Sequence, residues 1–156
     1  MSPKPIVMDV DTGVDDALAI LLAFRSPELQ VQGITTVHGN VGVEASTANT
    51  LIVLDLAQAP PTPVVAGAAR PLRRSARTAG EVHGLDGLGD LSPRPPVSPR
   101  QAGSGAHRFL LDQARKAPGR SGRLPRAMST ISPISSSQFR VLPSTPITVQ
   151  ASGSRK

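Results

Sequence analysis

The alternation of short apolar runs with longer runs of helical periodicity, in the first half of the chain, most constrains the fold. The runs "PIVMDV" (5–10) and "LQVQGITTV" (29–37) have the length and composition of strands, and "VVAG" (64–67) predicts a third. Between them, residues 15–24 and 43–59 repeat their apolar positions as helices do. Strands that alternate with helices favour parallel βαβ units. We therefore predict an α/β fold: an open, mostly parallel sheet with flanking helices.

The composition predicts an aliphatic core and no membrane segment. Hydrophobic residues make up 38% of the chain but aromatic residues only 2%, so Val, Leu, Ile and Ala have to fill the core. The absence of cysteine excludes disulfides, thiolate nucleophiles and cysteine metal sites. The apolar runs are shorter than the ~20 residues that span a bilayer. No secretory signal pattern opens the chain, so we expect a cytoplasmic protein without a membrane partner.

The charge is divided unevenly along the chain. Residues 1–112 hold all 11 acidic residues and 9 of the 17 lysines and arginines, whereas residues 113–156 hold the other 8 and no acid. A last helical run covers 104–119, and from residue 121 the chain is rich in Ser, Pro and Arg without useful periodicity. Such a composition does not offset the entropy of ordering. We predict two parts: a folded portion over 1–120 and a disordered basic tail over 121–156.

This basic tail raises the question of a nucleic-acid partner. Single-strand binders stack bases on aromatic side chains, and the tail offers only Phe139. We therefore do not expect nucleic-acid binding. A basic arm for RNA stays an alternative, which salt-dependent binding lost on deletion of 121–156 would support.

A cluster of four aspartates follows the first predicted strand, in "VMDVDTGVDDALAI": Asp9, Asp11, Asp15 and Asp16. Asp9 and Asp11 point to the same side of an extended segment, while the other two stand at a helix start, where the macrodipole favours carboxylates. A turn at Gly13 folds the pairs together. One aspartate can cap a helix, but four exceed that need. Carboxylates about 4 Å apart repel by ~4 kcal/mol at an effective dielectric of 20, so the cluster needs protons or a cation. Oxygen ligands alone select Ca²⁺ or Mg²⁺.

Two known aspartate loops can be compared with this segment. An EF-hand loop starting at Asp9 requires Gly and Glu where this chain has Val14 and Ile20, so that motif is excluded. A haloacid-dehalogenase-type phosphatase also follows a strand with D-x-D, which would make Asp9 the nucleophile and Asp11 the acid. That pattern leaves "GVDD" unexplained and stays an alternative.

The segment "DVDTGVDDALAI" resembles the N-terminal signature, D-x-D-x-G-x-D-D, of the nucleoside hydrolases of the inosine-uridine-preferring type. Three further segments resemble the same family in the same order: "GITTVHGNV" (33–41), "PVVAGAARPL" (63–72) and "VHGLDGLGD" (82–90). The resemblance covers a little over half of the chain. It implies that residues 1–120 are the N-terminal portion of a nucleoside-hydrolase-like α/β domain.

This resemblance implies a ribonucleoside hydrolase, an enzyme that cleaves the N-ribosidic bond of a ribonucleoside into ribose and free base with a bound Ca²⁺ ion. It also implies roles for individual residues: Asp11 and Asp16 as calcium ligands, Asp15 as general base on the attacking water, Asn40 as a contact to the ribose, and Asp9 as a support beside the cluster. A homo-oligomer, dimer or tetramer, is consistent with the same resemblance.

His83, in "EVHGLDG", is the candidate to protonate the leaving base. Glycosidic cleavage passes through an oxocarbenium-like state and needs an acid for the leaving group opposite the activated water. Because Gly-rich stretches flank His83, we expect it on a mobile loop. The alternative is a solvated surface histidine.

The segment after residue 120 departs from the family. Family members are about twice as long and continue after a helix like 104–119 into a strand and a Gly-Pro-Leu-Thr-Asn loop, which is absent here. The change suggests the hypothesis of a shifted reading frame or truncated gene, which fails if the source DNA encodes no family-like continuation. Because the family also draws a backbone carbonyl, an Asp and a His from its second half, we expect weak metal binding and little hydrolysis by this chain alone. A non-catalytic fragment with a basic tail is the further alternative.

Overall fold

The computed structural model describes residues 2–73, 75–116 and, for the backbone, 140–143. Its elements follow the predicted alternation: β1 (Lys4–Val10), α1 (Val14–Arg25), β2 (Leu29–Thr36), α2 (Val43–Leu56), β3 (Val64–Ala66), α3 (Gly80–His83), β4 (Gly103–Ser104), α4 (Ala106–Lys116) and β5 (Arg140–Pro143). The α/β fold predicted from the sequence is confirmed. No helix in the described part of the chain combines the length and hydropathy needed to cross a membrane.

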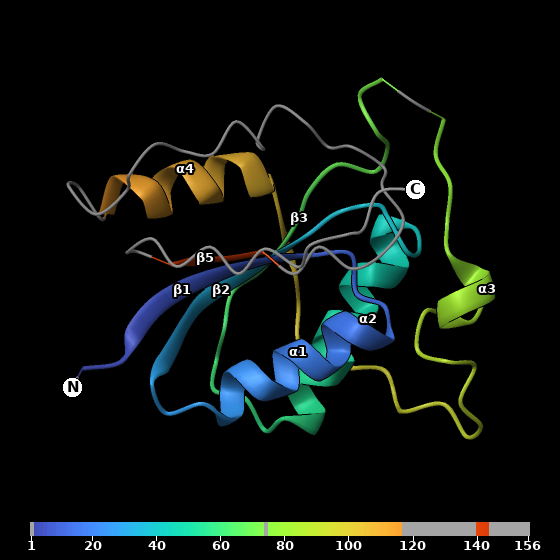
Figure 1. Ribbon diagram of the computed structural model, residues 1–156, viewed down its shortest axis with the longest axis horizontal. Coiled ribbons are helices and arrows are strands. Elements are labelled where there is room, and N and C mark those ends of the chain that lie inside the picture. The colour runs from blue at the N-terminus through green and yellow to red at the C-terminus, as the bar shows by residue number, and fades with distance from the viewer. Residues whose placement is uncertain (1, 74, 117–139, 144–156) are drawn as a thin grey trace, which may run out of the picture.

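One sheet carries these elements, in the order β4-β3-β2-β1-β5. The first four strands are parallel, and β5 runs antiparallel to β1. Helices α1 and α2 cover one face of the sheet and α4 covers the other (Figure 1). Elements α3, β4 and β5 were not predicted, because they are too short for sequence periodicity to reveal them. Strand β5 lies inside the predicted tail, and the rest of 121–156 lies outside the described residues.

The core is aliphatic, as the composition predicts. In β1, side chains alternate between the two faces, so Ile6, Met8 and Val10 point into the layer formed with α1 and α2. The cluster of buried residues contains Ile6, Met8, Val10, Ile20, Ala23, Ile34, Val53, Leu54, Ala57, Ala59 and Val64. Strands β1 and β2 pair up to Val10 opposite Thr36, so they end at the same level of the sheet.

This shared end is the carboxyl edge of the parallel strands. The amide of Val37 donates to the carbonyl of Val10 at 3.0 Å, and the amide of Gly67 donates to Thr36 at 2.8 Å, which continues the strand pairing into the loops. Helix α3 is tied to the same edge, because the amide of Ala79 donates to the carbonyl of Asn40 at 2.9 Å. In Figure 1, α3 lies beyond the ends of β1 and β2. Ligand crevices of open α/β sheets form at this edge.

Candidate active site

Asp11 is the first residue after β1, and backbone amides fix its position. Its Oδ2 accepts a hydrogen bond from the amide of Asn40 at 2.8 Å, while its own amide donates to Oδ2 of Asp16 at 3.0 Å. A Cβ added at Gly39 would overlap the carboxylate of Asp11, so only glycine leaves room for the carboxylate there. The loop after β2 is thus shaped to receive the carboxylate from the loop after β1.

Asp16 lies in the first turn of α1 and is buried. Burial, followed by the nearby carboxylates of Asp11 and Asp15, raises the pKa of Asp16 from 3.8 to about 8. The amide of Asp11 opposes this shift but does not cancel it. The raised pKa of Asp16 thus has two origins: the burial of its carboxyl group and the repulsion from two neighbouring carboxylates. No cationic side chain among the described residues lowers it.

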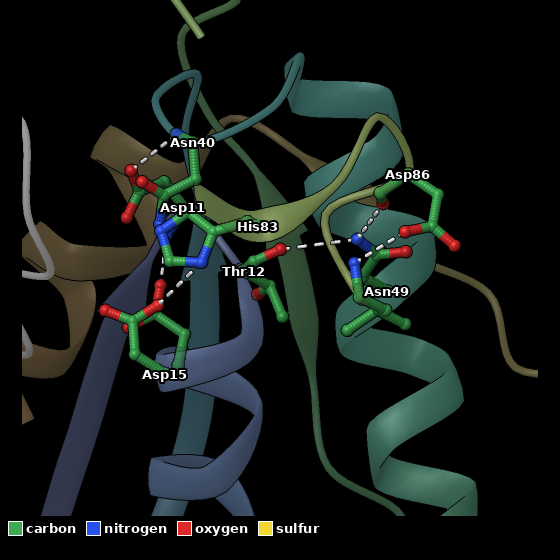
Figure 2. Close-up of polar contacts among 9 residues, drawn as sticks. Asp11, Thr12, Asp15, Asn40, Asn49, His83 and Asp86 are labelled. Carbon is green, nitrogen blue, oxygen red and sulfur yellow. Dashed lines mark hydrogen bonds and ion pairs between the residues drawn. The ribbon is translucent and has the colours of Figure 1, made fainter. Parts of the chain in front are cut away.

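Asp15 and His83 face each other across the site. Their nearest atoms, Oδ1 of Asp15 and Nδ1 of His83, are 3.8 Å apart (Figure 2). About 31% of the Asp15 side chain is exposed, yet both of its carboxylate oxygens are buried. A Cβ added at Gly13 would lie 2.8 Å from Nδ2 of Asn40 and 2.9 Å from Cγ of His83, so both side chains converge over this glycine.

Four buried polar atoms at this point have no hydrogen-bond partner among the described residues: Oδ1 and Oδ2 of Asp15, Nδ2 of Asn40 and Nδ1 of His83. Buried polar groups in folded proteins are nearly always paired, so a group of unpaired ones indicates a place for a ligand. The carboxylate accepts hydrogen bonds, the amide donates them, and the imidazole nitrogen does either. This set is complementary to a ligand that carries several hydroxyl groups and a water molecule.

Asp9 belongs to β1 itself. Its Oδ1 accepts a hydrogen bond of 2.6 Å from Oγ1 of Thr35, the residue opposite it in β2. The neighbouring strand therefore holds this carboxylate. Its supporting role beside the cluster stays a prediction.

The fit of a metal ion can be tested on the same residues. Within the described residues, no group of three or more His, Cys, Asp or Glu side chains has an arrangement that could hold a metal ion by itself. Asp11 and Asp16 nevertheless offer oxygen atoms to a cluster without counter-charge, which suits a hard cation. The donor chemistry fits a hard cation such as Ca²⁺ or Mg²⁺, and the remaining ligands have to come from water, a substrate or other residues.

The structure brings together five of the six predicted site residues, and it changes the interpretation of one of them. Asp11, Asp15, Asp16, Asn40 and His83 share the carboxyl edge. The expectations of a mobile loop or a solvated surface for His83 are wrong: it is 7% exposed and ends the short helix α3. The physical reason is the space over Gly13, which the sequence does not reveal and which the imidazole fills.

Sequence reasoning missed the polar face of α2. Ser46, Asn49 and Thr50 are fully buried at helical spacing, although their residue types usually favour the surface. The hydroxyl groups of Thr50 and Thr12 form a hydrogen bond of 2.6 Å. Polar residues at positions i, i+3 and i+4 inside the apolar run 43–59 were the signal that could have revealed this face.

The site is thus a cluster of carboxylates with an amide and an imidazole, placed at the edge of the sheet where parallel α/β proteins bind small ligands. Comparisons with known proteins agree with this class. The family model described as inosine-uridine preferring nucleoside hydrolase matches residues 6–130. The chain belongs to this family. The match also extends past residue 120, into the segment that the sequence analysis assigns to the tail.

Individual relatives support the same assignment. The chain is 42% identical over 117 residues to uridine nucleosidase 1 of Arabidopsis thaliana, which covers 74% of this chain and 34% of that protein. It is 40% identical over 110 residues to the inosine-uridine preferring nucleoside hydrolase of Leishmania major, and the match covers 70% of this chain and 35% of that protein. It resembles the solved structure of a purine-preferring ribonucleoside hydrolase from Gardnerella vaginalis with a TM-score of 0.67 and 36% identity, over 72% of this chain and 37% of that chain.

The chain therefore spans about a third of the length of these relatives. The family match favours the nucleoside-hydrolase resemblance over the haloacid-dehalogenase alternative. The geometry agrees, because the unpaired oxygens belong to Asp15, whereas Asp9, the nucleophile of the phosphatase hypothesis, is hydrogen-bonded by Thr35.

Proposed function

We propose that this chain carries the N-terminal part of a ribonucleoside hydrolase site, which cleaves the N-ribosidic bond of a nucleoside with water to give ribose and a free base. One observation carries the proposal: the unpaired, buried atoms of Asp15, Asn40 and His83 converge beside the carboxylates of Asp11 and Asp16. The substrate class follows from the names of the relatives, which are nucleosidases and nucleoside hydrolases.

Asp15 acts as the general base in this proposal. Neither of its carboxylate oxygens has a hydrogen-bond partner among the described residues, so both are available to a water molecule. As that water attacks the anomeric carbon, it loses a proton to the carboxylate, and the bond to the base breaks. The negative charge of the carboxylate cluster stabilises the positive charge that develops on the ribose ring.

His83 donates a proton or a hydrogen bond to the leaving base. An inverting reaction places its acid and base on opposite faces of the sugar, roughly 6.5–9.5 Å apart. The separation of 3.8 Å between His83 and Asp15 is shorter than that. The nucleoside therefore has to enter between the two groups, which moves the imidazole off the carboxylate. Asn40 donates its unpaired Nδ2 to a ribose hydroxyl.

Asp11 and Asp16 hold a calcium ion in this proposal, with Asp9 supporting the cluster from β1. When bound, the ion supplies a template that orients water and the ribose hydroxyls. The protein residues contribute the charge: ionised Asp16 needs a cation because burial and two nearby carboxylates oppose its ionisation. The expected cytoplasmic location and the expected dimer or tetramer stay predictions.

Release of reducing sugar from inosine and from uridine in the presence of Ca²⁺ tests the proposal. We expect Asp15→Asn to lower kcat on the order of 10²–10⁴-fold, the usual contribution of a general base. Asp112→Asn is the matched control, because Asp112 is exposed on α4 and pairs with Arg115 away from the site. Equal turnover by the Asp15→Asn variant and the unaltered chain would contradict the assignment of the base.

A further inference from the structure

A buried amide joins the two segments that carry the proposed acid and base. Asn49 lies near the middle of α2 and is fully buried. Its Nδ2 donates one hydrogen bond to the carbonyl of Thr12 at 3.3 Å and another to the carbonyl of Asp86 at 2.8 Å. Figure 2 shows the amide between these two loops. Thr12 comes shortly before Asp15 in the chain, and Asp86 shortly after His83.

The hydrogen-bonding capacity of this amide is used by protein groups. An asparagine side chain has two N–H donors, and both carbonyls just named take one. Its Oδ1 accepts a hydrogen bond from Nη2 of Arg94 at 3.4 Å. Both donors of Asn49 are therefore taken and its side chain is fully buried, so it acts through the segments that it holds.

The turn after α3 is built to approach Asn49 closely. Gly87 has a φ of +81°, a conformation that glycine adopts without strain. A Cβ added there would lie 2.9 Å from Nδ2 of Asn49 and 2.8 Å from Cγ1 of Val41. Both the backbone angle and the close packing therefore require glycine at position 87, and glycine lets the turn approach Asn49 on α2.

The same turn is tied to His83. The amide of Gly89 donates to the carbonyl of His83 at 2.7 Å. Within the turn, Oδ1 of Asp86 accepts from the amides of Leu88 and Asp90 at 2.8 and 3.0 Å. A displacement of Asp86 is thus passed on to the backbone of His83 through a short chain of hydrogen bonds.

We infer that Asn49 is a positioning residue, which pins the turn at residues 84–89 to the loop after β1 and so holds the backbone of His83 beside the segment that carries Asp15. Its catalytic meaning rests on the proposed function. The contact of Asn49 with the two loops does not depend on the proposed function. Hydrogen exchange measures this contact without substrate or metal.

The test uses the full chain and three variants. Asn49→Ala removes both donors. Ser46→Ala is the matched control, because Ser46 lies one turn earlier on α2, is equally buried, and its hydroxyl has no hydrogen-bond partner among the described residues. Gly87→Ala pushes the turn away from Asn49 without altering α2 and keeps the test decisive if the first variant does not fold.

Amide hydrogen exchange of Gly89 is compared with that of Ile34, whose amide is hydrogen-bonded to Pro63 in the sheet. We expect Asn49→Ala and Gly87→Ala to accelerate exchange at Gly89 at least about tenfold and to leave Ile34 within about twofold, since local opening is independent of global unfolding. Ser46→Ala is expected to change neither rate. Unchanged exchange at Gly89, or equal acceleration at both amides, overturns the inference.

Kinetics on inosine separate this inference from the proposed function. We expect Asn49→Ala to lower kcat on the order of 10²-fold with little change in KM, because it misplaces the acid and removes no substrate contact. Turnover by the unaltered chain is expected to be slow, because the chain carries only the N-terminal part of the site. Turnover that is absent altogether counts against the proposed function for this chain. The exchange rates then still decide whether Asn49 holds His83 in place.

Discussion

Two carboxylate sites at opposite ends of α2 show how environment decides the role of an aspartate. At the site end, burial raises the pKa of Asp16, and two neighbouring carboxylates add to the shift. At the far end, hydrogen bonds from Ser98 and then Arg100 lower the pKa of Asp55. Nε of Arg100 lies 2.6 Å from Oδ1 of Asp55, and the same guanidinium donates to the carbonyls of Ala59 and Pro60.

The different surroundings of these aspartates indicate different roles, structural for Asp55 and functional for the cluster at the carboxyl edge. Asp55 is partly exposed, and Arg100 and Ser98 are its partners. These contacts attach the C-terminal end of α2 to the segment that follows residue 97. Asp11, Asp15 and Asp16 lie close together at the carboxyl edge, and Asp16 is buried. No lysine or arginine among the described residues pairs with them, which costs stability unless a ligand is bound. Perturbed carboxylates of this kind indicate a functional site. Four predictions test this contrast.

The largest effect is expected for calcium binding. Replacing Asp11 and Asp16 together, as Asp11→Asn with Asp16→Asn, removes both proposed anionic ligands, and we expect calorimetric affinity for Ca²⁺ to fall by at least about 100-fold, or roughly 2.7 kcal/mol. The control Asp112→Asn is expected to bind as the unaltered chain does. Equal affinity of the double variant and the unaltered chain would place the cation elsewhere.

A smaller effect is expected when the space for Asp11 is filled. A Cβ at Gly39 would overlap the Asp11 carboxylate, so we expect Gly39→Ala to lower the free energy of unfolding by about 1–3 kcal/mol and to weaken Ca²⁺ binding. Gly103→Ala is the control, because a Cβ there meets only the carbonyl of Val64 at 3.9 Å. Denaturant unfolding measures the stability of both variants, and calorimetry measures their Ca²⁺ binding. Equal stability of the two variants would show that the loop relaxes freely.

The pH dependence of stability tests the raised pKa of Asp16. Between its unfolded value of 3.8 and its folded value of about 8, only the folded state holds the proton. The stability conferred by this proton is therefore fully present below about pH 4, falls as pH rises from 4 to 8, and is lost above about 8, with a slope of at most about 1.4 kcal/mol per pH unit. Unfolding in a chelator at several pH values measures the slope.

The matched variant for this slope is Asp16→Asn, which is expected to lose the fall between pH 4 and 8. Because a cation displaces the proton, Ca²⁺ affinity is expected to rise with pH up to about 8 in the unaltered chain. Parallel pH profiles for the chain and its Asp16→Asn variant would refute the shift.

The smallest effect is expected at the far end of α2. Arg100→Ala removes the partner of Asp55 and the hydrogen bonds to two backbone carbonyls. We expect Tm to fall by no more than about 4 °C, and Ca²⁺ affinity to stay unchanged. Thermal unfolding and calorimetry measure the two quantities. A loss of Ca²⁺ affinity would show that the two ends of α2 are coupled.

The amino-acid sequence alone predicts the class of fold and most of the candidate site. Periodicity revealed β1, α1, β2 and α2, because each is long enough for its apolar positions to repeat. The spacing of Asp11, Asp15 and Asp16 around Gly13 predicted a carboxylate cluster, because a strand, a tight turn and a helix start leave few other arrangements. These are local properties of the chain.

The placement of His83 and Asn49, in contrast, follows from how the elements pack in three dimensions. His83 is buried because the missing side chain of Gly13 leaves space for the imidazole. Asn49 is a connector because α2 brings it between Thr12 and Asp86, residues that lie far from it in sequence. Contacts of this kind depend on how separate elements pack, so no spacing within one segment predicts them.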